Sequence, residues 1–230
     1  MSRVRLYLSN DTSSGAAGAE RLAEAWRLRS DVELVRTSSR GAFFLEPMVE
    51  RDSSEGRVAW CQVTADDLPK ILAGDGGLPV FTIPFLSKQT RHTFAAFGVT
   101  EPLSLEAYQA HGGLAGLRAA RQVSPSAISQ EIKTSRLRGR GGAAFPVWKK
   151  WDVAATTIAD RKYVVANADE GDAGTYCDRM IMEGDPFRLI EGMLICARAI
   201  GATAGYIYCR QEYPAAVACL HAAIRVVEAA

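Results

Sequence analysis

The chain has 230 residues, 48% of them hydrophobic and 23% charged, which is the composition of an ordinary globular protein with a sizeable core. A formal net charge of +1 gives no reason to expect nucleic acid or an anionic membrane as the main partner. No apolar run is long enough to cross a bilayer, and the first residues alternate charged and apolar side chains, unlike a signal peptide. We therefore expect a cytoplasmic protein without a membrane span.

Hydrophobic periodicity and turn residues predict strands at residues 4–8, 32–36, 48–51 and 57–63, and helices at residues 15–29 and 66–73. This β-α-β-β-β-α order is that of a thioredoxin-like unit, which we assign to residues 1–85. The redox dithiol of such units is missing, so we expect neither thiol chemistry nor cluster ligands there.

A stretch punctuated by proline and glycine follows, with a predicted helix at residues 104–111. Flexible linkers are more polar and contain fewer aromatic residues, so we interpret residues 86–124 as a connector that packs along the next domain.

Residues 125–230 carry stronger signals. We predict helices at residues 125–137, 186–200 and 214–230, a buried strand at residues 163–166 and a second strand at residues 206–209. A strand, a crossover helix, a second strand and a helix predict a parallel sheet of Rossmann-like type. The predicted fold class is therefore α/β, with a thioredoxin-like unit followed by an incomplete Rossmann-like domain.

A glycine-rich loop at residues 138–146 is predicted between the first of these helices and the first strand. Gly139, Gly141 and Gly142 would let the backbone approach a ligand closely and turn its N–H groups toward an anion. Arg140 and the nearby lysines could neutralise a phosphate. The alternative is an ordinary tight loop with solvated basic residues, because a single glycine cluster is weakly specific.

A second polar segment, residues 167–174, follows the predicted buried strand, and open α/β sheets bind ligands at the carboxyl ends of their strands. Asn167 can donate and accept at once, which suits the edge of an isoalloxazine or nicotinamide ring. The carboxylates of Asp169 and Glu170 suit ribityl or ribose hydroxyls but not phosphate. The two loops would then hold opposite ends of a nucleotide. The alternative is a polar turn capped by acidic residues.

Three aromatic residues near the glycine-rich loop could stack on a nicotinamide or adenine ring, or could be core residues: Phe145, Trp148 and Trp151. The three histidines are isolated from one another, so no catalytic triad is predicted. The five cysteines show no CxxC spacing and no cluster that could hold a metal, and we expect most of them to be reduced and buried. Cys177 lies in a polar, glycine-rich segment, which keeps a functional thiol open as the lesser alternative.

Several segments follow one another in register over about the last hundred residues: Leu137-Arg138-Gly139-Arg140-Gly141-Gly142-Ala143-Ala144-Phe145-Pro146, Lys150-Trp151, Val165-Ala166-Asn167-Ala168-Asp169-Glu170-Gly171, Asp178-Arg179, Asp185-Pro186, Glu191-Gly192-Met193 and Tyr206-Ile207-Tyr208. Together they resemble the NADH-binding flavoprotein subunit of respiratory complex I. Its relatives include diaphorase subunits of NAD-linked hydrogenases and β subunits of NAD-dependent molybdenum or tungsten formate dehydrogenases.

The N-terminal half resembles the formate dehydrogenase β subunit, which also begins with a thioredoxin-like region lacking cluster ligands. The segments that carry this resemblance are Ser39-Arg40-Gly41, Leu45-Glu46-Pro47, Ile83-Pro84-Phe85-Leu86, Lys88-Gln89 and Glu101-Pro102-Leu103-Ser104-Leu105. We therefore expect the parent enzyme to be an NAD-dependent formate dehydrogenase.

The resemblance implies that residues 125–230 are the first part of an FMN- and NAD(H)-binding domain. The implied FMN-binding residues are Gly139, Arg140, Gly141, Gly142, Lys150, Asn167, Asp169 and Glu170. Phe145 would stack on the nicotinamide ring of NAD, and Asp172 would lie near it. No side chain is implied as catalytic, because hydride passes between NAD(H) and the flavin. Electrons would pass to an iron–sulfur γ subunit and connect with a molybdenum or tungsten α subunit.

Two departures from the family pattern stand out. Complex I relatives usually have Gly-Phe-Pro-Thr-Gly before the Lys-Trp pair, and Trp148 of this chain could crowd the flavin or the NAD entrance. The chain also ends at Ala230, less than half of the family's usual length. We expect the later flavin- and NAD-binding loops, the ubiquitin-like domain and the [4Fe–4S] domain outside it. The alternatives are a non-catalytic assembly fragment, or the equivalent subunit of complex I or a hydrogenase.

Overall fold

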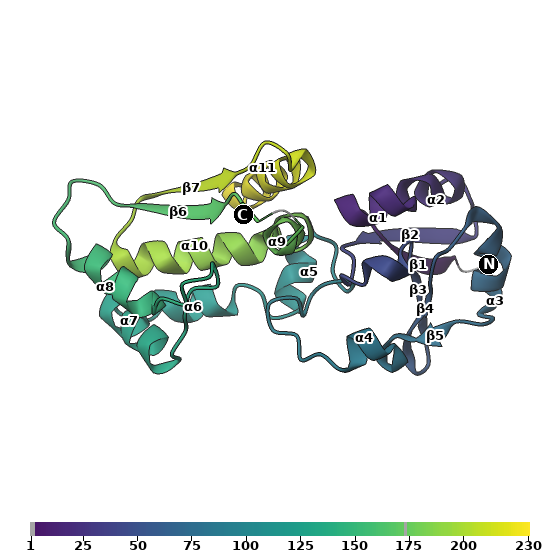
Figure 1. The fold of residues 1–230 in the computed structure, drawn as a ribbon, viewed down its shortest axis with the longest axis horizontal. Helices are drawn as coiled ribbons and strands as arrows, with labels where there is room; N and C mark the ends of the chain where they lie inside the picture. Colours follow the sequence, from purple (N-terminus) through teal and green to yellow (C-terminus); the bar gives the residue numbers. More distant parts are fainter. Residues whose placement is uncertain (1–2, 173) are drawn as a thin grey trace.

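The computed structural model describes residues 3–172 and 174–230. Ala173, which belongs to the second polar segment, lies outside the described residues. The elements of the N-terminal sheet and those of the C-terminal sheet lie at opposite ends of an elongated molecule (Figure 1). The connecting segment passes between them, and α9 (Cys177–Gly184) lies beside α1 (Thr12–Ala17) where the two ends meet.

The N-terminal sheet has five strands in the order β2-β1-β3-β4-β5. They are β1 (Val4–Ser9), β2 (Val32–Thr37), β3 (Val49–Ser53), β4 (Gly56–Trp60) and β5 (Leu78–Pro79). The pair β1–β2 is parallel and the other pairs are antiparallel. This arrangement agrees with the predicted thioredoxin-like fold. The buried core of this sheet includes Leu6, Leu8, Trp26 and Ile71.

The helices of this unit differ from the prediction in one place. The single helix expected at residues 15–29 is two helices, α1 and α2 (Ala19–Trp26), separated by Gly18 with a φ of 109°. The first begins early because the Asp11 carboxylate accepts a hydrogen bond of 3.0 Å from the amide of Ser14. The remaining elements are η1 (Phe43–Leu45), η2 (Ala65–Asp67) and α3 (Leu68–Ala73).

The connecting segment contains η3 (Val80–Thr82), α4 (Pro84–Ser87), α5 (Leu105–Ala110) and α6 (Ala115–Arg121). Its second half is anchored to α10 (Pro186–Ile200) by the buried carboxylate of Glu191. That carboxylate accepts hydrogen bonds from the Tyr108 hydroxyl (2.5 Å) and from the amides of Leu114 (2.8 Å) and Leu117 (2.9 Å). The segment therefore packs along the C-terminal elements.

The C-terminal sheet consists of β6 (Tyr163–Ala168) and β7 (Ala204–Cys209), which pair in parallel. Helix α10 crosses from one strand to the other, and α11 (Pro214–Glu228) follows β7. The predicted strand–helix–strand–helix order is confirmed. The remaining helices are α7 (Pro125–Thr134), α8 (Val147–Thr156) and α9.

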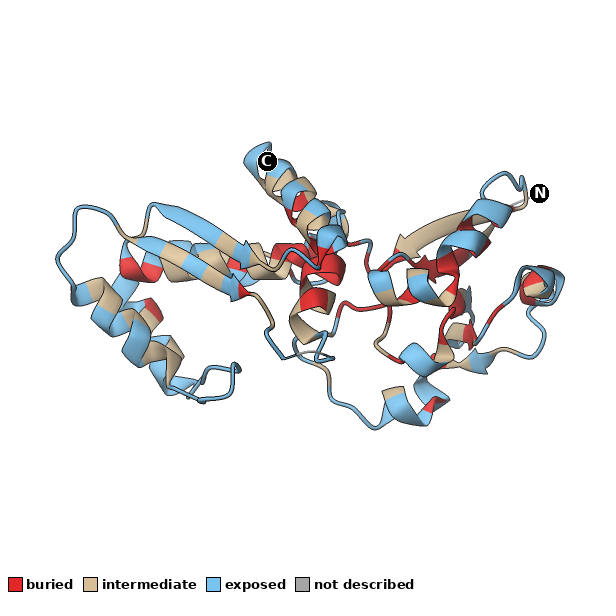
Figure 2. Cartoon of the chain, turned by 45° about the horizontal axis from the view of Figure 1, so that its top comes forward, coloured by how far each residue is buried: buried red, intermediate tan, exposed pale blue. Residues whose placement is uncertain are grey.

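One face of this parallel sheet is open to solvent, unlike most parallel sheets, which are covered on both faces. Tyr163, Val165, Tyr206 and Tyr208 are 46–64% exposed, whereas α10 packs against the other face. In Figure 2 both strands are coloured exposed or intermediate along most of their length, while buried residues gather toward the middle of the molecule. The prediction of a buried strand at residues 163–166 is therefore wrong, because only alternate side chains face α10.

Two helices of the C-terminal half, besides α4 and α6 of the connecting segment, and the partial burial of the cysteines were not expected from sequence. Helix α8 follows the glycine-rich loop directly, and Cys177 begins α9 instead of lying in a loop. All five cysteines are free and only partly buried, and burial raises the thiol pKa of Cys177. In the described parts of the chain, no helix is long and apolar enough to span a bilayer. Those parts also hold no group of three metal-binding side chains.

Candidate functional site

The glycine-rich loop connects α7 to α8 and is closed at its base by backbone contacts. The amide of Gly139 donates to the carbonyl of Phe145 (2.9 Å), and the amide of Val147 donates to the carbonyl of Leu137 (3.1 Å). The Arg138 guanidinium donates to the carbonyl of Ala144 (3.0 Å). These bonds fix the stem and leave the tip to project outward.

The tip of this loop is exposed and open. A Cβ atom built at Gly141 or Gly142 would have no neighbouring atom within 4 Å. Among the described residues, no hydrogen bond engages the amides of residues 140–143, and the Arg140 side chain is exposed. Unengaged amides in a glycine-containing turn beside a cation are suited to an anion. The residues present therefore fit a phosphate group.

Some side chains around this loop are exposed, and others pack against neighbouring residues. Phe145 is 49% exposed, and Lys150 lies exposed on α8. The Trp148 ring is contacted by the ammonium groups of Lys133 and Lys149, at 4.7 and 5.7 Å from its centroid. Trp151 packs instead in a core cluster with Ile128, so for Trp151 the core interpretation holds.

Asn167 lies within β6, one residue before its end, and not after the strand as expected. Its side-chain oxygen accepts a hydrogen bond of 3.1 Å from the amide of Asp169, and the residue is exposed. Asp169 is half-buried and Asp172 is exposed. A fixed amide at a strand end with a carboxylate beside it can recognise a group that both donates and accepts hydrogen bonds.

Glu170 has a role that the sequence did not reveal. Its carboxylate accepts hydrogen bonds from the amides of Asp178 (2.7 Å) and Arg179 (3.1 Å) at the start of α9. It also accepts a hydrogen bond of 3.0 Å from the Tyr213 hydroxyl, while the Glu170 carbonyl accepts one of 3.0 Å from Arg210. Burial and this carboxylate raise the pKa of Tyr213, which keeps it a donor. The Glu170 side chain thus caps a helix and organises its own loop.

Glu170 forms a cluster with Arg179, Arg210 and Tyr213. These three residues were not predicted as site residues from the sequence, although Asp178-Arg179 is part of the family resemblance. The Arg179 guanidinium lies 4.2 Å from the centroid of the Tyr176 ring, and Arg210 lies 5.3 Å from that of Tyr213. A cleft of about 440 Å³ opens beside them, lined by Thr12, Gly174, Tyr176, Arg179, Arg210, Glu212, Tyr213 and Pro214. Nothing in local periodicity signals this cluster, because its members come from three separate stretches of the chain.

The two predicted loops are not joined by a direct polar contact among the described residues. Among the described residues, no hydrogen bond or ion pair joins residues 138–146 to residues 167–172. Each loop is ordered by its own neighbours, the first by its stem and the second by α9 and Tyr213.

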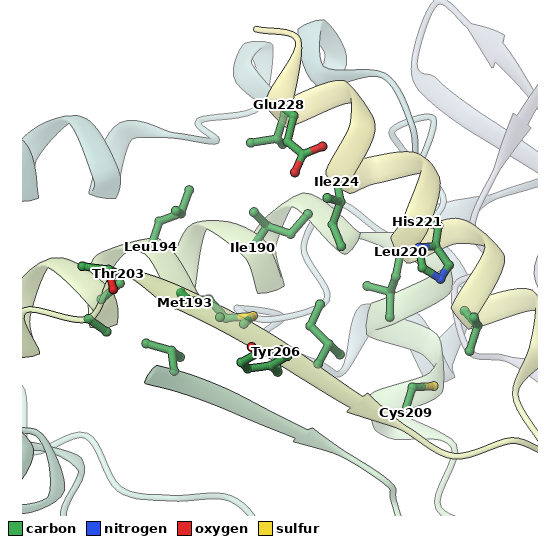
Figure 3. A pocket seen from close by; sticks show the side chains of 18 residues that line it. Ile190, Met193, Leu194, Thr203, Tyr206, Cys209, Leu220, His221, Ile224 and Glu228 are labelled. Atoms are coloured by element: carbon green, nitrogen blue, oxygen red, sulfur yellow. The ribbon is translucent and has the colours of Figure 1, made fainter. Parts of the chain in front are cut away.

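A larger groove lies elsewhere, between α10, α11 and β7, with a volume of about 660 Å³ (Figure 3). Its lining is mostly aliphatic, from residues such as Ile190, Met193, Leu194, Leu220 and Ile224. No arginine or lysine lines it, so its chemistry does not suit a phosphate. The volume of this groove alone does not make it the functional site, and the two polar loops remain the candidate site.

Comparison with known proteins shows what the second half of the chain is similar to. The family described as the Nuo51 FMN-binding domain matches residues 132–230. The NADP-reducing hydrogenase subunit HndC of Solidesulfovibrio fructosivorans is 44% identical over 60% of this chain and 28% of its own length. The mitochondrial 51 kDa subunit of NADH-ubiquinone oxidoreductase from Neurospora crassa is 49% identical over 42% of this chain and 20% of its own length.

The matched part thus spans less than a third of these relatives' length. A solved NAD⁺-reducing [NiFe]-hydrogenase aligns over 99% of this chain and 41% of its own, with 25% identity and a TM-score of 0.48. Residues 132–230 thus resemble an FMN-binding domain, and the chain is similar to subunits of NAD(P)H-linked oxidoreductases. More narrowly, through residues 132–230 the chain is related to the complex I-like NADH-binding flavoprotein subunits.

Proposed function

We propose that residues 139–150 and 167–172 form part of an FMN site in a subunit that exchanges electrons with NAD(H). The observation that carries this proposal is the exposed glycine-rich tip with unengaged amides, in the segment that matches an FMN-binding family. The match covers the site segments and less than a third of the relatives' length, so the proposed site is one part of a larger one.

Each residue has a proposed task. The unengaged amides of residues 140–142, with Arg140 and Lys150, bind the flavin phosphate, while the Gly139 amide closes the loop stem on the Phe145 carbonyl. Asn167 and Asp169 hold the ring and ribityl end, and Glu170 fixes the backbone that presents them. Phe145 offers an exposed ring to the nicotinamide of NAD, with Asp172 near it. When bound, FMN supplies hydride exchange with NAD(H) and single-electron transfer, which no side chain of this chain could perform.

A more specific proposal concerns the enzyme complex that contains this chain. An iron–sulfur γ subunit would exchange electrons with this chain, and a molybdenum or tungsten α subunit would oxidise formate. This is supported by the N-terminal segments that resemble formate dehydrogenase β subunits, such as Ser39-Arg40-Gly41 and Leu45-Glu46-Pro47. The hydrogenase and ubiquinone-linked relatives supply the alternative assemblies. NAD⁺ reduction by formate and by hydrogen, measured on the complex that copurifies with this chain, distinguishes them.

Titration of the purified chain with FMN, followed by quenching of flavin fluorescence, tests the site itself. We expect saturable binding that Arg140→Ala weakens about tenfold, because a charge-assisted contact to phosphate is lost. Arg161→Ala, at another exposed arginine outside both loops, is the matched control and should leave binding unchanged. A chain that takes up no FMN would instead support a non-catalytic assembly role.

A further inference from the structure

The carboxyl ends of β1 and β2 are covered by α9. A Cβ atom at Gly184, in the last turn of α9, would lie 2.7 Å from the Cβ of Ser38 and 2.8 Å from the ring of Phe97. Real Cβ atoms essentially never approach so closely, so only glycine permits this packing. The end of α9 is thus seated tightly against the segment that follows β2.

Polar contacts join the same helix to the start of α1. The amide and hydroxyl of Thr12 donate to the Glu183 carboxylate, at 2.8 and 2.7 Å. The Arg179 guanidinium donates to the hydroxyl of Ser13 and lies 4.0 Å from Glu183. Glu183 and Arg179 are both buried, with side chains 4% and 9% exposed. Buried charges that lose a partner are destabilised strongly, so these contacts hold α9 in one position.

The opposite end of α9 is tied to the candidate FMN loop. Glu170 caps the helix through the amides of Asp178 and Arg179, and it belongs to the same loop as Asn167 and Asp169. One residue, Arg179, takes part at both ends, since its amide binds Glu170 and its guanidinium binds Ser13. A displacement of α9 would therefore shift Glu170 and the loop together.

We propose that the thioredoxin-like unit is a positioning element: Thr12 and Ser13 hold Arg179 and Glu183, and these fix the loop at residues 167–172. Arg179 and Glu183 act as positioning residues, through the helix and the loop that they hold. The carboxyl ends of β1 and β2 are occupied by α9, so the proposed positioning role needs no thiol or cluster in this unit. What the loop binds rests on the proposed function, whereas the coupling itself does not.

The first experiment measures amide hydrogen exchange across residues 167–184 in the full chain without ligand. Thr12→Val removes the hydroxyl donor to Glu183 and should raise exchange at the Asp178 and Arg179 amides about tenfold, the effect of one hydrogen bond to a charged group. Thr12→Ser keeps the hydroxyl and should restore protection. Thr82→Val removes a hydroxyl bonded to the Pro79 carbonyl (2.7 Å) away from α9, and should change nothing in this window.

The second experiment measures FMN affinity in the same variants by fluorescence quenching. Thr12→Val should weaken binding about tenfold, while Thr12→Ser and Thr82→Val should bind like the unsubstituted chain. Unchanged exchange in residues 167–184 of Thr12→Val, in a folded chain, overturns the proposal. Raised exchange in a chain that never binds FMN upholds the coupling and rejects the proposed function, so the two failures are distinguishable.

Discussion

The Tyr213 hydroxyl donates a hydrogen bond of 3.0 Å to the carboxylate of Glu170, which links the loop after β6 to the segment after β7. The ends of two parallel strands are thereby tied through one acidic side chain. Because the same carboxylate caps α9, it connects three segments of the C-terminal half.

Replacing Glu170 tests this linkage. Glu170→Ala leaves two helix amides and the Tyr213 hydroxyl without their acceptor, so we expect a loss of about 2 kcal/mol in the free energy of unfolding. Urea denaturation followed by circular dichroism measures it. Glu212→Ala removes an exposed carboxylate that pairs with Arg210 in solvent, and should leave the stability nearly unchanged. Equal losses in both variants would contradict the capping role.

Two neighbouring glycines of the loop should respond differently to alanine. Gly142 has a φ of 105°, which strains any L-residue, so Gly142→Ala should destabilise the chain by about 1 kcal/mol. Gly141 has no positive φ, and its added methyl group would enter open space at the proposed phosphate position. Gly141→Ala should therefore preserve the melting temperature and weaken FMN binding. If Gly141→Ala binds FMN normally, the phosphate lies elsewhere.

Glu46 makes stability depend on pH. Burial raises the pKa of its carboxyl from 4.5 to about 7, although the amide of Met48 donates to it at 2.9 Å. Since the folded-state pKa lies above the unfolded value, the ionised form is disfavoured on folding. The resulting loss of stability is absent below about pH 4.5, grows as pH rises toward about 7, and is constant above that.

Glu46→Gln removes this titration, so its stability relative to the unsubstituted chain should rise between about pH 5 and about pH 8. The gain has an upper limit of about 3 kcal/mol, from about 1.4 kcal/mol for each unit of pKa shift. Urea denaturation at the two pH values measures it, with exposed Glu55→Gln as the control. A difference that stays constant with pH would refute the assignment to Glu46.

Glu191 should anchor the connecting segment. Its carboxylate accepts three hydrogen bonds, so Glu191→Ala should lower the free energy of unfolding by about 3 kcal/mol and expose residues 111–114 to limited proteolysis. Tyr108→Phe removes one of the three and should have a smaller effect, about 1 kcal/mol, without new cleavage. Identical proteolysis of Glu191→Ala and the unsubstituted chain would show that other contacts hold the segment.

Local patterns predicted much of this fold. Alternating apolar residues and turn residues located β1 to β4, and Ser104, Pro125, Pro186 and Pro214 marked helix starts that the structure confirms. Helix α9 was missed because Gly171, Gly174 and Tyr176 make its approach resemble a loop. Its cap, Glu170, lies eight positions before Asp178, beyond the spacing of any local capping pattern.

The candidate site was predicted only in part, because some of its residues lie beyond the reach of local sequence patterns. Glycines and basic residues close together in the sequence predict a candidate phosphate loop, because all the residues that this prediction needs lie in one chain segment. The cluster of Glu170, Arg179, Arg210 and Tyr213 forms only when separate segments fold together, which sequence spacing does not encode. The separation of Thr12 from Glu183, 171 positions along the chain, is the extreme case.

The open face of β6 and β7 has a consequence for handling the chain on its own. Tyr163, Val165, Tyr206 and Tyr208 form an aromatic and aliphatic strip on a sheet that has two strands in the described part of the chain. Each strand therefore has an outer edge whose backbone groups can pair with a strand from another molecule. At high concentration, two such sheets can join edge to edge through these backbone groups, and two exposed strips can pack face to face and shield each other from water. Colloidal stability of the isolated chain should thus depend on this strip more than on its net charge.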